Sequence, residues 1–175
     1  MKNKYEIRGG ITAIIINSPK YGRLETLINT NKLKKANEFS GTWGVVYSKS
    51  ARSFYVQGNE PMVNGRRGAV QLHRWVTDAP SNLVCDHFDS NTLNNTDKNL
   101  RLITQAENMQ NRKAQHNSFS GIRGVYWYKQ TKKWNAQVGK KNIGYFDDIE
   151  DARKAVESAR SEMMPYSKEA YRNAN

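Results

Sequence analysis

Short apolar and β-branched runs, separated by polar turns, dominate the first 70 residues. Runs of this kind predict strands, and Asn-Ser-Pro clusters such as the one after Ile16 end them. Two of the runs flank a short polar turn, which predicts a hairpin. The pattern therefore indicates a β-rich module over residues 1–70. Its expected elements are strands at Thr12–Ile16, Arg23–Ile28, Trp43–Tyr47 and Ser53–Gln57, helical turns at Asn31–Asn37 and a basic loop at Gly65–Gly68.

Residues 71–115 follow a different pattern, in which two short apolar runs enclose a loop rich in Asn and Asp. Thr104 and Glu107 have the spacing of a capping box, in which each side chain satisfies a free backbone donor at the start of a helix. The predicted order is a strand at Val84–Phe88, a loop at Asp89–Lys98, a strand at Leu100–Ile103 and a helix from Thr104 to about Lys113.

Residues 116–175 predict a small module of three strands and one helix. Ile149, Ala152, Val156 and Ala159 recur at helical spacing, so this stretch has an apolar face for packing on a sheet. The whole chain is therefore expected to be α+β, in three modules. The last module has expected strands at Gly124–Tyr128, Trp134–Val138 and Asn142–Phe146, a helix at Ile149–Arg160 and a tail at 161–175.

Composition limits the class of protein. Hydrophobic residues make up 37% of the 175 residues and the mean hydropathy is −0.85, so several small cores are expected rather than one large core. The single cysteine, Cys85, excludes an intrachain disulfide and a Cys-rich zinc ribbon. The longest apolar run, Ile11–Ile16, is too short to cross a membrane. We expect a cytoplasmic protein with no membrane partner.

Charge points to a polyanionic partner. The formal net charge is +12, which favours binding to nucleic acid. Residues 1–70 contain 12 basic and 4 acidic side chains, residues 71–115 contain 5 of each, and residues 116–175 contain 11 and 7. A neutral centre between basic flanks suits a cation-binding site whose flanks hold phosphates. For residues 1–70 two interpretations stay open, a structural sheet that packs on the next module and a DNA-clamping module.

The central module carries the candidate chemistry. Asp86 and Asn108 offer oxygen ligands of the kind that Mg²⁺ takes, and His87 has an ordinary pKa suited to a general base. Adjacent residues of a regular strand point to opposite faces, so Asp86 and His87 share a site only if the strand ends or distorts there. Gln105, Asn108 and Arg112 fall on one helix face, which would bring Arg112 to a phosphate. Taken singly, these residues are more often structural than catalytic.

Together they form a recognisable signature. Residues 84–101 read VCDHFDSNTLNNTDKNLR and residues 104–112 read TQAENMQNR, and they resemble the signature of HNH homing endonucleases. His73-Arg74 also resembles a His-Arg pair upstream in this family. The resemblance implies a ββα-metal fold, with His87 as general base, Asp86 and Asn108 as metal ligands and Asn99 as the brace of the loop. It gives His73 no chemistry, and we expect that side chain to pack.

A second resemblance lies in the last module. Ser120–Trp127, Trp134–Val138, Gly144–Phe146 and Asp151-Ala152 are similar to an AP2-type DNA-binding domain, which implies a sheet laid in the major groove. Arginines of the plant-type pattern are replaced by Tyr126 and Tyr128, so base preference should differ. The implied DNA-facing residues are Arg123, Tyr126, Tyr128, Gln130 and Gln137, with Lys129, Lys132, Lys133, Lys140 and Lys141 as phosphate contacts.

The two resemblances predict a DNA endonuclease that uses Mg²⁺ or Mn²⁺ and acts on double-stranded DNA rather than a small molecule. We expect a homing or mobile-element enzyme, encoded by a phage or mobile element and active in a bacterial host. The alternative is a DNA-binding transcriptional regulator that keeps an HNH fold without cutting. The absence of heptads favours a monomer. One such site would nick DNA, and a double-strand break would need two.

Overall fold

The computed structural model describes residues 1–63, 66–111, 114, 117–167 and 169–170, with side chains described outside residues 61–67. The fold is mixed α+β, with several small sheets and few helices, as expected. The chain forms two compact units, Met1–Thr104 and Gln105–Asn175. Among the described residues, no helix is long and apolar enough to cross a membrane.

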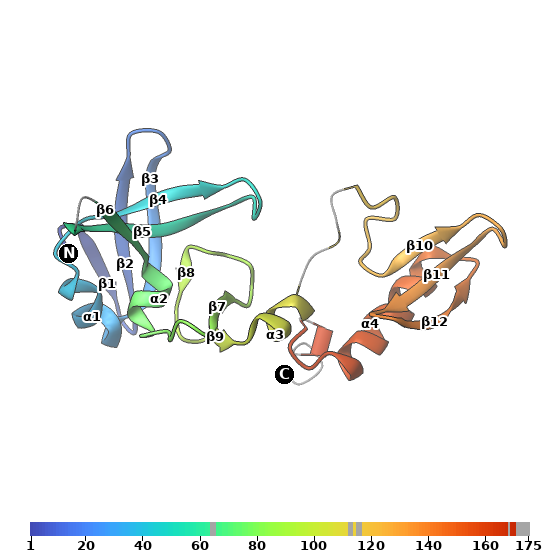
Figure 1. Cartoon of the computed structure of the whole chain (residues 1–175). Coiled ribbons are helices and arrows are strands. Elements are labelled where there is room, and N and C mark those ends of the chain that lie inside the picture. The colour runs from blue at the N-terminus through green and yellow to red at the C-terminus, as the bar shows by residue number, and fades with distance from the viewer. Residues whose placement is uncertain (64–65, 112–113, 115–116, 168, 171–175) are drawn as a thin grey trace. The chain divides into compact units, whose positions relative to one another are not determined.

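The first unit contains two sheets and a hairpin (Figure 1). One sheet has the order β1-β2-β3-β8, with β8 parallel to β3 and the other pairs antiparallel. The other has the order β4-β5-β6. The elements are β1 (Tyr5–Arg8), β2 (Ile11–Ser18), β3 (Gly22–Asn29), the 3₁₀ turn η1 (Thr30–Lys32), α1 (Leu33–Glu38), β4 (Trp43–Ser48), β5 (Ser53–Val63), β6 (Arg66–Gln71), α2 (Leu72–Val76), β7 (Val84–His87), β8 (Asn94–Asn95) and β9 (Leu100–Ile103).

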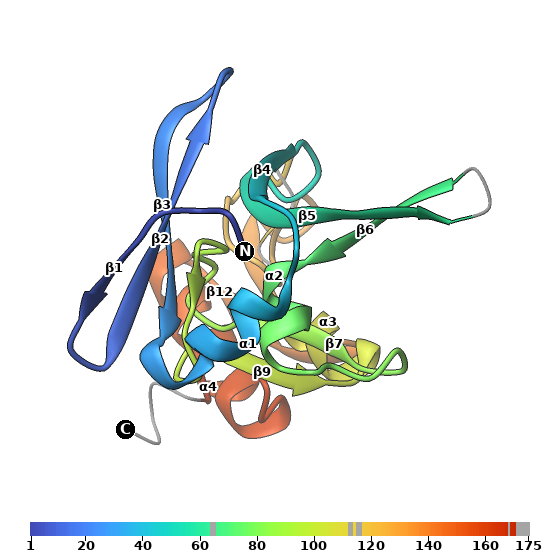
Figure 2. The same ribbon diagram turned by 90° about the vertical axis from the view of Figure 1, so that its left-hand side faces the viewer.

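One apolar core joins the elements of this unit. Ile14 and Ile16 of β2 and Ile28 of β3 are buried in it, because alternate residues of a strand face the same side. Phe39 packs on Trp43 with ring centroids 4.3 Å apart. Figure 2 shows α1 beside α2 at the edge of this core. Leu72 and Val76 of α2 belong to the same core, which therefore spans sequence on both sides of residue 70.

The compact units have other boundaries than the expected modules. Residues 1–70 and 71–104 share one core and one compact unit, and the division into three modules stays a prediction. The described part of the expected basic loop at 65–68 is also different, because Arg66–Gly68 belong to β6 and pair with β5. The short elements β1, β8 and α2 have no matching expectation, since each is fixed by tertiary partners more than by its own sequence pattern.

The predicted strand, loop, strand and helix of the central segment are present. The helix α3 (Gln105–Gln110) begins directly after Thr104, and its expected end at Lys113 lies outside the described residues. The assignment of this segment as a ββα-metal core stays a prediction.

The second unit contains the three strands and packing helix that the sequence predicts. β10 (Val125–Tyr128), β11 (Lys133–Val138) and β12 (Lys141–Phe146) form an antiparallel sheet, and α4 (Ile149–Met163) covers one face of it (Figure 1). Asp148 caps α4 by accepting hydrogen bonds from the backbone of Glu150 and Asp151. The expected tail is partly packed, because Ser167 is fully buried and Glu169 pairs with Arg160.

Trp43→Ala should destabilise the first unit by about 3–5 kcal/mol, because the indole is fully buried among the aromatic rings of the core. Urea unfolding followed by circular dichroism measures this loss. Tyr47→Ala, at a half-exposed position of the same strand, is the matched control and should cost much less. Equal losses in the two variants would contradict the assignment of Trp43 to the core.

Candidate active site

The candidate site lies on the β7–β9 hairpin. Asp86 pairs with Arg101 and His87 with Leu100 in an unbroken antiparallel register. The strand ends at His87, as the sequence required, but it stays regular across both residues. His87 is therefore buried on one face while Asp86 is half-buried on the other. The two side chains stand at one strand end, with different surroundings.

Asn99 holds the loop between the strands. Its Oδ1 accepts from the backbone N–H of Asp89 at 2.8 Å, and its Nδ2 donates to the carbonyl of Asn94 at 2.7 Å. The backbone carbonyl of Asn99 also accepts from Phe88. The buried amide of Asn99 thus ties the start and the middle of the loop to the residue that follows the loop. A part for Asn99 in catalysis stays a prediction.

His87 is set in a buried, mostly polar environment. Its Nε2 lies 2.9 Å from Oδ1 of Asn95, and its ring lies 4.9 Å from that of His73 and 6.2 Å from that of Tyr55, between centroids. Burial lowers the pKa of His87, although Asn95 and the charge of Asp86 act in the opposite direction. The lowered pKa keeps the imidazole neutral near pH 7, which is the protonation state a general base needs.

His73 packs against His87, as expected for a residue without assigned chemistry. It is buried on α2, and burial lowers its pKa to about 3, with the neighbouring His87 and Arg74 adding to the effect. Arg74, the other member of the His-Arg pair, donates to the carbonyls of Leu83, Ala79 and Pro80. Both residues therefore stabilise the segment between α2 and β7.

Asp86 is paired on its own face of the hairpin. Its Oδ2 accepts from Nη2 of Arg101 at 2.5 Å, and the Arg101 guanidinium lies over the Phe88 ring. A carboxylate is the kind of ligand that Mg²⁺ or Mn²⁺ prefers, so the donor chemistry fits. Among the described residues, no group of three or more His, Cys, Asp and Glu gathers as a metal site. Asn108 lies on α3 in the second unit, and Arg112 lies outside the described residues.

The candidate DNA-facing residues lie on the second unit. Register places Tyr126 and Tyr128 on the sheet face away from Val125, which packs under α4. The ring of Tyr145 lies 5.5 Å from that of Tyr128 and extends this open face. The tyrosine hydroxyl of Tyr128 donates to Gln130. Exposed or half-exposed polar residues around the face are Lys129, Gln130, Lys132, Lys133, Gln137, Lys140 and Lys141.

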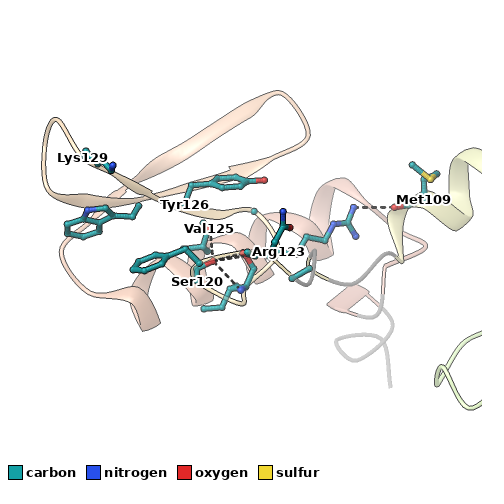
Figure 3. Close-up of a pocket in the computed structure, with 13 residues that line it drawn as sticks. Met109, Ser120, Arg123, Val125, Tyr126 and Lys129 are labelled. Carbon is teal, nitrogen blue, oxygen red and sulfur yellow. Dashed lines mark hydrogen bonds between the residues drawn. The ribbon is translucent and has the colours of Figure 1, made fainter. Parts of the chain in front are cut away.

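Arg123 makes contacts within the second unit. Its guanidinium donates to the carbonyl of Met109 at 3.2 Å (Figure 3) and to that of Gln110 at 2.6 Å, both in the last turn of α3. Its own carbonyl accepts from Arg160 at 2.5 Å. The carbonyls at the end of a helix lack partners within the helix, and Arg123 satisfies two of them. Arg123 therefore has a packing role within the second unit, and its contact with DNA stays a prediction.

A large open cavity of about 850 Å³ lies beside Arg123 in the second unit (Figure 3). Its wall includes Tyr126 and Lys129 of the expected DNA-facing set, and Ser120, which donates to the carbonyl of Val125. The phenyl ring of Phe119 also lines it and is 84% exposed. The cavity is thus an aromatic and basic recess at the start of β10.

Two residues of the His87 environment were missed by sequence reasoning. Asn95 lies within the HNH-like segment at 84–101, and this position was the signal that could have marked it. The resemblance gave Asn95 no role. Thr26 bonds to Asn95 across 69 positions of sequence, and no local pattern marks it.

Two viral proteins are similar to part of the chain. An uncharacterised HNH endonuclease of Acanthamoeba polyphaga mimivirus, L560, is 39% identical over 64 residues, which cover 33% of this chain and 34% of that protein. Protein 3.8 of Escherichia phage T7 is 37% identical over 59 residues, which cover 34% of this chain and 49% of that protein. The matches span a third to a half of these relatives. No family model and no solved structure matches the chain.

The first unit should lose stability as pH falls below about 6.5. The pKa of His73 is lowered in the folded chain, so the unfolded chain binds the proton first, and each pH unit of acidification costs about 1.4 kcal/mol per histidine. Urea unfolding between pH 6.5 and 5 measures this slope, above the range where most carboxylates titrate. His73→Gln should flatten it, and an unchanged slope in that variant would contradict the buried, neutral state of His73.

Proposed function

We propose that the chain is a metal-dependent DNA endonuclease of the HNH type. The observation that carries the proposal is the position of the buried His87 imidazole at the end of β7, bonded to Asn95, beside a loop that Asn99 braces and next in sequence to the carboxylate of Asp86. The partial similarity to a viral protein named as an HNH endonuclease supports the same function. DNA is therefore the proposed substrate, and phosphodiester hydrolysis is the proposed reaction.

Each residue has a proposed part in that reaction. The imidazole of His87 takes a proton from the water that attacks the scissile phosphate. Asp86 and Asn108 would hold Mg²⁺ or Mn²⁺, which supplies charge stabilisation of the phosphoryl oxygen and the leaving 3′ oxygen when bound. Asn99 keeps the loop closed so that the strand end bearing His87 stays fixed.

The second unit is proposed to bind double-stranded DNA in the manner of an AP2-like sheet. Tyr126, Tyr128 and Gln137 would meet the groove, while lysines in the turns meet phosphates. Tyrosine cannot make the bidentate contact that arginine makes with guanine, so recognition would rest more on apolar contact and amide hydrogen bonds. The expected biological setting is a homing or mobile element, with a monomer that nicks one strand.

A second candidate function is DNA binding without cleavage. Two observations favour it: His87 is only 5% exposed, and Asp86 is engaged with Arg101 on the opposite face of the strand. A regulator that keeps the HNH fold would need neither group to reach a phosphate. An assay of DNA cleavage distinguishes the two functions, because a nuclease and a regulator are both expected to bind DNA.

His87→Ala should lower nicking of supercoiled plasmid in Mg²⁺ by about 10²–10⁴-fold, which is the usual contribution of a general base. DNA binding measured by gel shift should persist, because His87 is buried and offers little to a DNA surface. Lys154→Ala, at an exposed position of α4, is the control and should nick at the rate of the unaltered chain. Nicking by His87→Ala at that same rate would remove the assigned base.

Loss of the lysines in the β11–β12 turn should weaken DNA binding and its salt dependence. In Lys140→Ala and Lys141→Ala, the slope of log affinity against log salt should fall by about one for each phosphate contact removed. Lys154→Ala on α4 is the matched control for a change of net charge alone. Equal slopes in all three variants and the unaltered chain would contradict the assignment of this turn to DNA.

A further inference from the structure

A chain of buried hydrogen bonds leads from the N-terminal sheet to His87. The hydroxyl of Thr26 on β3 donates to the carbonyl of Leu93 at 2.8 Å. Nδ2 of Asn95 on β8 donates to the same hydroxyl oxygen at 2.7 Å, and Oδ1 of Asn95 lies 2.9 Å from Nε2 of His87. Thr26, Asn95 and His87 are 0%, 1% and 5% exposed, so water does not compete with these bonds.

The donor and the acceptor of each hydrogen bond in this series follow from the bond that Thr26 makes. A carbonyl oxygen can only accept, so the single hydroxyl proton of Thr26 is committed to Leu93. The hydroxyl oxygen of Thr26 must then accept from Asn95, which turns the NH₂ group of that amide toward Thr26. The amide oxygen of Asn95 consequently faces His87, and an oxygen there requires a donor. Nε2 of His87 therefore carries its proton.

The opposite orientation of the Asn95 amide is disfavoured at the Thr26 end. It would set the amide oxygen against a hydroxyl whose proton is already committed to Leu93, whereas the imidazole of His87 can pair with either end of the amide by changing its tautomer. The orientation of the amide is thus fixed by Thr26 rather than by His87. The N-terminal sheet therefore determines which nitrogen of the imidazole carries the proton.

We propose that Thr26 and Asn95 are positioning residues that hold neutral His87 as the Nε2–H tautomer, and so make Nδ1 the nitrogen that takes the proton from water. The part about water rests on the proposed function of His87, whereas the tautomer does not. A histidine base works only through the nitrogen that lacks a proton, and that nitrogen is set by the bond that the other one makes.

This inference gives residues 1–70 a specific task. β8 pairs in parallel with β3, with Leu27 opposite Asn94 and Ile28 opposite Asn95. The pairing brings the end of the HNH-like loop onto the N-terminal sheet, where Thr26 is the residue that meets the Asn95 side chain. The sheet is therefore a support that orients the base, which goes beyond the two interpretations of packing and DNA clamping.

Nitrogen-15 NMR of histidine side chains in the full-length chain at pH 7.5 tests the tautomer without DNA. The unaltered chain should show His87 protonated at Nε2 alone. In Thr26→Val, a methyl group replaces the hydroxyl at similar volume, Asn95 loses its acceptor, and the Nδ1–H form should appear. Thr26→Ser keeps a hydroxyl at the same position and is the matched control that should preserve the Nε2–H form. Plasmid nicking should fall by about tenfold or more in kcat for Thr26→Val, with little change in KM, and recover in Thr26→Ser.

The outcomes separate the two proposals. An Nδ1–H signal for His87 in the unaltered chain, or an unchanged tautomer in folded Thr26→Val, would overturn the positioning inference whatever the nicking rate. A tautomer change in Thr26→Val supports that inference even where the unaltered chain fails to nick any DNA, a result that would count against the nuclease function alone.

Discussion

The short parallel pairing of β8 with β3 is the constraint on which the first unit depends. Only two residue pairs make it, yet it fixes the Asn-rich loop against the N-terminal sheet. The backbone N–H of Leu27 and the hydroxyl of Thr26 both bond to the carbonyl of Leu93, which adds two further ties at the same place. Because Thr26 is fully buried, breaking its bond leaves an unpaired hydroxyl away from water, at a cost of about 1–3 kcal/mol.

The composition of the loop follows from this position. The loop is buried in part, at Thr92, Asn95 and Thr96, and has little ladder pairing. Its buried polar groups must therefore be satisfied through side chains, and an amide both donates and accepts. Asn99 bonds in this way to Asp89 at the start of the loop and to Asn94 in its middle, and Asn95 joins the sheet to His87. Burial also keeps both neighbouring imidazoles neutral. The same buried polar layer thus stabilises the loop and sets the state of the proposed base.

Most of the secondary-structure elements could be predicted from the sequence, but few of the tertiary contacts could. The strands β2, β7 and β9, and the three strands and helix α4 of the second unit, follow from local apolar periodicity, which reports which face is buried. A loop was expected at Arg66–Gly68 because the local sequence shows basic residues between glycines and does not show the pairing with β5. The packing role of Arg123 was not predicted, since sequence position does not show that its guanidinium meets the carbonyls at the end of α3. Thr26 lacks any local signal, because its meaning comes from a partner far along the chain.

We propose that the strand end at Asp86 and His87 cuts DNA with a divalent metal. The most direct measurement is the nicking rate of supercoiled plasmid as a function of Mg²⁺ concentration, for the unaltered chain and for Asp86→Asn, with EDTA as the blank. The claim predicts a rate that rises with Mg²⁺ to saturation, vanishes in EDTA and is lost in Asp86→Asn. Nicking that persists in EDTA, or that Asp86→Asn carries out at the unaltered rate, would contradict it.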